Sequence, residues 1–177
     1  MQIQRAIVLT LVACALATLP AEAQEAAHEI KAAEVTPYVA LGTAGVAPVG
    51  VAVTFPVTST LGVETDTAYR RGEGDIHALS TSVSLLWSLP RVGQATPYLA
   101  AGMGVSQCGV PVFSFDGPPI GTQSRLAWTL NTGGGVKMKL SDKVDLRTDA
   151  RWFKSVGKQG SEEFRVAQGI SFDAFKR

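Results

Sequence analysis

The chain has little of what metal sites, disulfide frameworks and membrane-spanning helices are built from. Its 177 residues include two histidines and two cysteines, too few for the clustered ligands of a zinc site. The formal net charge is +1, so no excess of one sign attracts nucleic acid or an acidic partner. Beyond residue 23, no apolar stretch approaches the roughly 17–25 residues of a membrane-spanning helix. We therefore expect no metal, no cofactor, no nucleic-acid partner and a single domain.

The first 23 residues have the composition of a secretory signal peptide. Arg5 precedes an apolar run over 6–19, and its length fits the roughly 7–15 residues of a signal core. Pro20 ends the run, and Ala21-Glu22-Ala23 supplies the small residues of a cleavage site. We therefore expect 1–23 to be a signal peptide that is removed on export.

The predicted cleavage leaves two parts. Residues 24–34 are polar and rich in alanine, which predicts a flexible lead-in to a domain over 35–177. An alternative start is a lipidated Cys14, because the three residues before it resemble a lipoprotein signal. If Ala23 is the cleavage site, Cys108 is the one remaining cysteine, and the sequence assigns it no role.

Polarity alternates along 126–152 in a way that is inverted for a soluble protein. In 126–140 and in 144–152, most of the residues at alternate positions are apolar. The residues between them include lysines, arginines and aspartates. Successive side chains of a strand point to opposite faces, so this period of two predicts two strands joined by a turn at Ser141-Asp142. An apolar face toward lipid and a charged face toward a lumen are typical of a membrane β-barrel.

The same alternation recurs along the domain and predicts eight strands. They lie at about 36–43, 50–57, 60–69, 76–89, 96–105, 126–140, 144–152 and 163–172. Compact turns follow the second, fourth and sixth strands, and glycine-rich or longer connections follow the first, third, fifth and seventh. This arrangement predicts an eight-stranded antiparallel up-and-down transmembrane β-barrel, with both termini at the short-turn end.

Two segments stand out within this pattern. TPYVALG at 36–42 and TPYLAAG at 96–102 match at five of seven positions, either through duplication of a half-barrel or because proline often begins a strand.

The predicted loop 106–124 is apolar for a surface loop, with three prolines and two phenylalanines. It is either a contact for a partner or a cover that folds onto the barrel rim.

The segments TPYLAAGMGVS (96–106) and TGGGVKMKLSDKVDLRTDARWF (132–153) resemble small outer-membrane β-barrel proteins of Gram-negative bacteria. That group includes OmpX-like barrels, OmpA-type transmembrane barrels and the opacity-protein porin family. The resemblance covers about 35–175 and implies a barrel in the bacterial outer membrane. We expect the protein to be a monomer in the lipid bilayer. We also expect a structural, envelope-integrity or surface-interaction role and no enzymatic activity.

The predicted inward faces carry a set of charges. An eight-stranded barrel is just wide enough to be filled by side chains, and buried charges must be paired. We therefore expect a structural network in the lumen, formed by Glu64, Asp66, Lys137, Lys139, Asp145, Arg147, Asp149, Arg151 and Arg165. On the outside, we expect aromatic residues at the lipid interface, namely Tyr69, Trp87, Trp128, Trp152 and Phe172.

Three other functions stay open. A lipid-modifying barrel enzyme needs a histidine beside a serine and a carboxylate, which His77 with Ser80, Ser82 and Asp75 could supply; His28 lies in the lead-in. A narrow diffusion pore would need water in the lumen, which a packed charge network leaves little room for. A soluble lipocalin-like carrier needs apolar residues inside, so the inverted faces argue against it.

Overall fold

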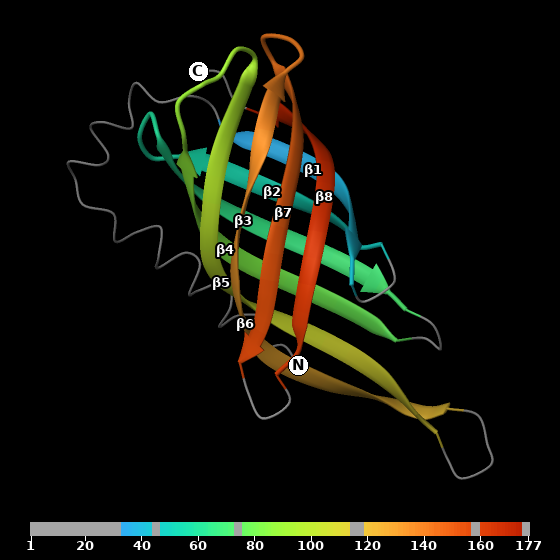
Figure 1. Cartoon of the computed structure of the whole chain (residues 1–177). Helices are drawn as coiled ribbons and strands as arrows, with labels where there is room; N and C mark the ends of the chain where they lie inside the picture. Colours follow the sequence, from blue (N-terminus) through green and yellow to red (C-terminus); the bar gives the residue numbers. More distant parts are fainter. Residues whose placement is uncertain (1–32, 44–46, 73–75, 114–118, 157–159, 175–177) are drawn as a thin grey trace.

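The computed structural model describes residues 33–43, 47–72, 76–113, 119–156 and 160–174, with the backbone alone for 110–113 and 119–123. These residues form a closed antiparallel β-barrel of eight strands (Figure 1). The strands are β1 (Glu34–Gly42), β2 (Val49–Pro56), β3 (Leu61–Arg71), β4 (His77–Ser88), β5 (Ala95–Phe113), β6 (Pro119–Lys139), β7 (Val144–Val156) and β8 (Glu162–Asp173). Each pairs with its neighbour in sequence, and β1 pairs with β8 to close the barrel. The predicted fold is confirmed.

Side chains along each strand point alternately outward and inward. The outward side chains are mostly apolar, and the inward ones are mostly polar or small. On β1, Leu41 is 74% exposed whereas its neighbour Ala40 is 3% exposed. On β4, Leu85 and Trp87 are exposed, while Leu86 between them is buried. Leu86 is thus a large apolar residue on an otherwise small or polar inward face. No described segment forms a helix of the length and apolarity that a membrane crossing demands.

The barrel has two different ends, which we call the turn end and the loop end. At the turn end lie the connections after β2, β4 and β6, where Val57 N–H donates to Leu61 O over 2.8 Å and Leu140 N–H donates to Val144 O over 3.0 Å. The first and last described residues meet there too, because Ala174 N–H donates to Ala33 O over 2.7 Å. The loop end carries the connections after β1, β3, β5 and β7.

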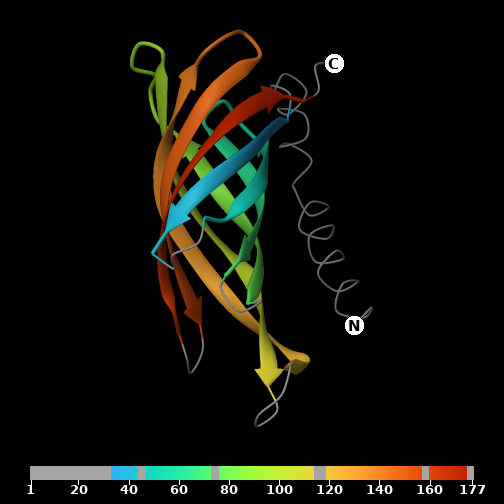
Figure 2. The same ribbon diagram turned by 90° about the vertical axis from the view of Figure 1, so that its right-hand side faces the viewer.

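The predicted loop 106–124 is wrong in its extent. β5 continues to Phe113 and β6 begins at Pro119, and their pairing runs unbroken in antiparallel order from the barrel to Val112 opposite Gly121. Pairing with β4 stops at Gly109 and pairing with β7 stops at Trp128. The two strands therefore project beyond the barrel as a hairpin (Figures 1 and 2).

The prolines that suggested a loop are compatible with this hairpin. Beyond the barrel rim each arm pairs on one side alone, and an edge strand tolerates proline because its outer N–H needs no partner. Residues 114–118 and the side chains of 110–123 lie outside the described part, so the apolar character predicted for the loop has no described counterpart.

The lumen is filled near the turn end and opens into a cavity near the loop end. The cavity has a volume of about 220 Å³, and its lining includes Pro48 and Ser161, which adjoin the connections of the loop end. Inward residues of several strands line it, Ser80 of β4 and Thr129 of β6 among them. A long polar side chain added to this part of the lumen therefore has room.

A charged side chain on each face of β4 should have opposite effects. Val83→Arg places a cation on the lipid-facing surface near the middle of the strand, and the expected cost is about 2–4 kcal/mol of folding free energy. Ser80→Glu enters the cavity, where Arg70 and Arg165 also lie in the wall, so the loss should be small. Urea unfolding in lipid vesicles measures both. A larger loss for Ser80→Glu would mean that the outer surface faces water.

Candidate functional site

The lumen gathers charged side chains from strands on opposite sides of the barrel. β3 contributes Glu64 and Asp66, β7 contributes Arg147, Asp149 and Arg151, and β8 contributes Arg165. Each of these side chains faces inward because its position has the inward parity of its strand. All six are between 1% and 7% exposed, so every charge among them must be compensated inside the barrel.

Four of these residues and a tyrosine form a central cluster, defined as Glu64, Tyr98, Arg147, Asp149 and Arg151. Glu64 accepts hydrogen bonds from both arginines: Arg147 contacts both carboxylate oxygens, and Arg151 Nη2 donates to Oε1 over 2.6 Å. Asp149 Oδ2 accepts from Arg147 Nη2 over 3.0 Å and lies 3.3 Å from Arg151 Nη2. Two carboxylates thus neutralise two guanidinium groups.

Tyr98 of β5 extends the central cluster, although sequence reasoning did not assign it a role. Arg147 Nε donates to the Tyr98 hydroxyl over 2.7 Å, and this hydroxyl donates to Asp149 Oδ2 over 3.0 Å. The guanidinium carbon of Arg147 lies 4.9 Å from the centroid of the tyrosine ring. A Cβ on Gly135, the cross-strand neighbour on β6, would lie 2.5 Å from the Tyr98 hydroxyl. Glycine there makes room for the ring.

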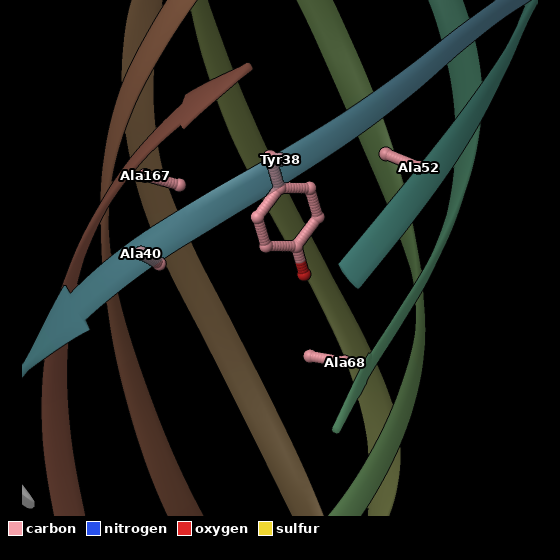
Figure 3. Close-up of a cluster of buried hydrophobic side chains, with 5 residues drawn as sticks. All are labelled: Tyr38, Ala40, Ala52, Ala68 and Ala167. Atoms are coloured by element: carbon pink, nitrogen blue, oxygen red, sulfur yellow. The ribbon is translucent and has the colours of Figure 1, made fainter. Parts of the chain in front are cut away.

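A second unit lies beside the central cluster around Arg165. Its Nη2 donates to Asp66 Oδ1 over 3.4 Å. Its guanidinium carbon lies 5.3 Å from the ring centroid of Tyr38 and 4.4 Å from that of Phe153. Figure 3 shows the Tyr38 ring among four alanines of β1, β2, β3 and β8, which keep the lumen narrow around it.

The two TPY segments therefore have the same role in the lumen. Tyr38 and Tyr98 occupy matching positions in the repeated segments 36–42 and 96–102, and each ring lies beside an arginine. The inward parity of both tyrosines was a signal available in the sequence. Their pairing with arginines was not, because β1 meets Arg165 and β5 meets Arg147 only through barrel closure.

Three residues of the predicted network lie outside both the central cluster and the unit around Arg165. Lys137 forms an ion pair with Glu34 near the turn end. Lys139 is exposed and pairs with Asp142 over 2.8 Å, so it belongs to the surface of that end. Asp145 is half-buried, opposite Lys139 in the pairing of β7 with β6. Glu34, which sequence reasoning placed in the lead-in, is the first residue of β1.

The residues considered for a catalytic site do not share a face. His77 has the outward parity of β4 and is exposed, whereas Ser80 and Ser82 have the inward parity. The wall of the barrel therefore separates the imidazole from both hydroxyls. Asp75 and His28 lie outside the described residues.

The predicted interface aromatics are all on the outer surface, in two groups. Trp87 and Phe172 lie near the turn end, since one is near the end of β4 and the other near the end of β8. Three others lie toward the loop end, namely Tyr69, Trp128 and Trp152. The ammonium of Lys154 lies 5.6 Å from the centroid of Trp152. Two aromatic belts flanking an apolar band are a feature of outer-membrane barrels.

No family model matches the chain, and no curated protein does. Several solved structures are similar to it. The N-terminal β-barrel domain of Pseudomonas aeruginosa OprF has 15% identity and a TM-score of 0.62, over 80% of this chain and 96% of that one. Neisserial surface protein A has 14% identity and a TM-score of 0.61, over 80% and 94%. The outer membrane enzyme PagL has 14% identity and a TM-score of 0.52, over 78% and 98%.

These comparisons concern the fold, because the identities are low. They confirm the resemblance to small outer-membrane barrels that residues 96–106 and 132–153 indicated. Structures described as an enzyme and as surface or barrel proteins share this fold, so the fold by itself does not separate a catalytic from a non-catalytic role. The chain is similar to small, closed, antiparallel transmembrane β-barrels of the outer-membrane type.

Proposed function

We propose that this protein is a non-enzymatic β-barrel of a bacterial outer membrane, with a structural, envelope-integrity or surface-interaction role. The observation that carries the proposal is the inverted polarity of the barrel. Leucine, valine, phenylalanine and tryptophan side chains cover its outside, and paired charges fill its inside. A soluble carrier needs the opposite arrangement, since its ligand would lie in an apolar lumen.

The central cluster supports a closed lumen rather than a diffusion pore. Its side chains span the barrel from β3 and β5 to β7 and are almost fully buried. Their charges cancel within the cluster, so a passing ion would have to break these pairs without replacement partners. We propose that the function lies in the outer surface and in the loop end, where the β5–β6 hairpin projects.

The separation of His77 from Ser80 and Ser82 supports a non-catalytic role, because the nucleophile and base of a hydrolytic site must be within hydrogen-bond reach. The likeness to the enzyme PagL is a likeness of fold. Mass spectrometry of lipid A from cells that produce the protein is the direct check. A change in acylation that is lost in His77→Ala would assign the enzymatic role instead.

When cells express the full-length chain, the mature protein should be in the outer membrane and should begin at Gln24. Fractionation of cells that express it, followed by N-terminal sequencing, measures both. Folded protein should migrate differently in a gel before and after boiling, as a closed barrel resists detergent. A lipidated N-terminus at Cys14 would replace the proposed signal cleavage. Recovery of the folded protein in the soluble periplasmic fraction would contradict the membrane location.

The wild-type barrel should show no steady conductance in planar bilayers, because the central cluster closes the lumen. Glu64→Ala with Arg147→Ala and Arg151→Ala removes three members together and leaves Asp149 as the remaining charge of the cluster. This variant should conduct more than the wild type if it folds. Large, steady open channels in the wild type would replace the closed barrel with a true pore.

Removing one arginine of the central cluster should destabilise the barrel. Arg147→Ala leaves Glu64 and Asp149 with fewer partners inside the lumen, and the expected loss is roughly 3–5 kcal/mol of unfolding free energy. The matched control is Lys139→Ala, which removes an exposed pair and should cost less than about 1 kcal/mol. Unfolding by urea in lipid vesicles measures both. Equal losses for the two variants would contradict a structural role for the cluster.

A further inference from the structure

The β5–β6 hairpin has two strand edges that no described strand covers beyond the barrel rim (Figures 1 and 2). β4 pairs with β5 as far as Gly109, and β7 pairs with β6 as far as Trp128. β7 turns back toward β8 at this level, because Ser155 N–H donates to Ser161 O over 2.8 Å. An unpaired edge presents a row of N–H and C=O groups with which another strand can pair.

The edge of β6 is open. Leu140 N–H donates to Val144 O at the start of β7, whereas Lys139 N–H donates to Gln94 O on the side of β5. Backbone groups alternate in direction along a strand, so the even-numbered residues of β6 direct theirs toward the β7 side. The pairing of β6 with β5 keeps one register as far as Gly121, and the same alternation therefore continues beyond the rim. The residues that direct an N–H and a C=O group away from the hairpin are Thr122, Ser124 and Leu126.

The edge of β5 is blocked by a proline. Pro97 O accepts a hydrogen bond from Leu89 N–H over 2.9 Å, so the odd-numbered residues of β5 direct their backbone groups toward the β4 side. Gly109 is the last of them that pairs with β4, and the next is Pro111, which has no N–H group. Proline is one of the residues that keep edge strands from pairing with other chains. The hairpin therefore has one blocked edge and one open edge.

A second copy of this chain offers a matching edge. A flexible peptide loses conformational entropy when it is ordered as a strand, whereas the edge of a second copy is already formed. Two identical edges that run antiparallel are related by a two-fold axis, so each contact occurs twice. With the axis at Ser124, this residue faces its own copy, and Thr122 faces Leu126 of the other copy. Three N–H donors from each copy then give six hydrogen bonds.

We propose that the β6 edges of two copies pair in antiparallel order across a two-fold axis, and that this contact joins two outer membranes that face each other. β6 runs from the loop end to the turn end, and the loop end of outer-membrane barrels faces the exterior. Copies in one membrane point the same way and would bring their β6 edges together in parallel. Copies in two facing membranes bring these edges together in antiparallel order.

The blocked edge of β5 limits the assembly to a pair. In the paired state, β5 and β6 of each copy form a continuous sheet of four strands, and β5 lies at both of its outer edges. Pro111 removes an N–H donor from each of these outer edges. The contact is therefore closed and does not continue into a fibre. The inference rests on the proposed outer-membrane location and gives the surface-interaction role a partner, a second copy of the chain.

The paired hairpins set the distance between the two barrels. Four residues separate Ser124 from Trp128 at the rim, and each residue of an antiparallel strand adds about 3.4 Å. The two Trp128 residues therefore lie roughly 27 Å apart along the strands. This short span brings the two bilayer surfaces close together, so phospholipid membranes without surface polysaccharide are the ones in which the contact is tested.

A cysteine at the two-fold axis tests the register. Ser124→Cys is made together with Cys14→Ser and Cys108→Ser, so that it is the sole thiol of the chain. Opposite Cα atoms of a hydrogen-bonded antiparallel pair lie about 5.5 Å apart, which a disulfide can span. The protein is placed in phospholipid nanodiscs with one barrel each, since a disulfide between two discs requires that the barrels face each other.

Under mild oxidation we expect covalent dimers of the Ser124→Cys protein to form at least fivefold faster than those of a control. The control is Val156→Cys in the same background, because Val156 is 55% exposed at the loop end and lies far from its own copy in the proposed pair. Equal rates for the two variants, or no dimer of Ser124→Cys, would overturn the proposal.

Removal of one backbone donor tests the hydrogen bonds. Ser124→Pro takes away an N–H group of the open edge, and its matched control Ser124→Ala keeps that group. Phosphatidylcholine vesicles carry each protein, and labelling of Val156→Cys by a membrane-impermeant reagent identifies the preparation with the loop ends outside. Many contacts act together between two vesicles, so a weak single contact is sufficient to cluster them.

Wild-type and Ser124→Ala vesicles should cluster, as measured by light scattering, and Ser124→Pro should slow clustering at least fivefold. Heat-modified mobility shows whether each variant is folded, and Thr122→Pro serves if Ser124→Pro does not fold. Equal clustering of the proline and alanine variants, or no clustering of the wild type, would overturn the inference.

The two proposals fail separately, because these measurements use purified protein and do not depend on where cells place it. Recovery of the folded protein in the soluble periplasmic fraction would contradict the outer-membrane location and leave the pairing of the β6 edges as measured. Failure of the Ser124→Cys protein to dimerise would overturn the pairing and leave the location unaffected.

Discussion

The carboxylate of Glu64 is the anion on which both arginines of the central cluster depend. It comes from β3, whereas Arg147 and Arg151 come from β7, so the contact links opposite walls of the barrel. Thr54 adds a hydrogen bond to the same carboxylate over 2.9 Å. With Asp149, which also pairs with both arginines, these are four buried charges that depend on one another, because each alone would carry a large desolvation cost. Their mutual pairing lets a polar interior coexist with an apolar exterior.

Small residues make this arrangement possible. Glycines of β6 and β2 leave room for the rings of Tyr98 and Tyr38, and alanines line the lumen around Tyr38 (Figure 3). Each tyrosine then lies against an arginine, which uses the ring face as well as its hydrogen bonds. The lumen is therefore packed by a few large polar side chains held among small ones. An interior of this kind stabilises one register of the strands.

The two ends of the barrel differ in chemistry. The turn end has short hydrogen-bonded turns, the part-buried Lys137–Glu34 ion pair and the exposed Lys139–Asp142 ion pair. The loop end holds a cavity with arginines in its wall and carries the β5–β6 hairpin beyond the rim (Figures 1 and 2). A rigid barrel with one elaborated end is an arrangement in which the scaffold positions groups for recognition. The packed charge network and the elaborated loop end therefore lie in different parts of this molecule.

The alternation of polarity in the sequence by itself determined the strand number, the closed antiparallel order and the inward position of Glu64, Arg147 and Arg151, because side chains point to opposite faces with a period of two. It did not determine which inward charges meet. Asp149 and Lys139 both belong to the predicted network, yet one is buried in the central cluster and the other is exposed at the turn end. The length of the β5–β6 hairpin was missed too, since an edge strand tolerates the prolines that ordinarily indicate a loop. Barrel closure and the stagger of the strands decide these contacts, because they bring inward side chains of β3, β5 and β7 together across the lumen. No local sequence pattern encodes which side chains meet across the lumen.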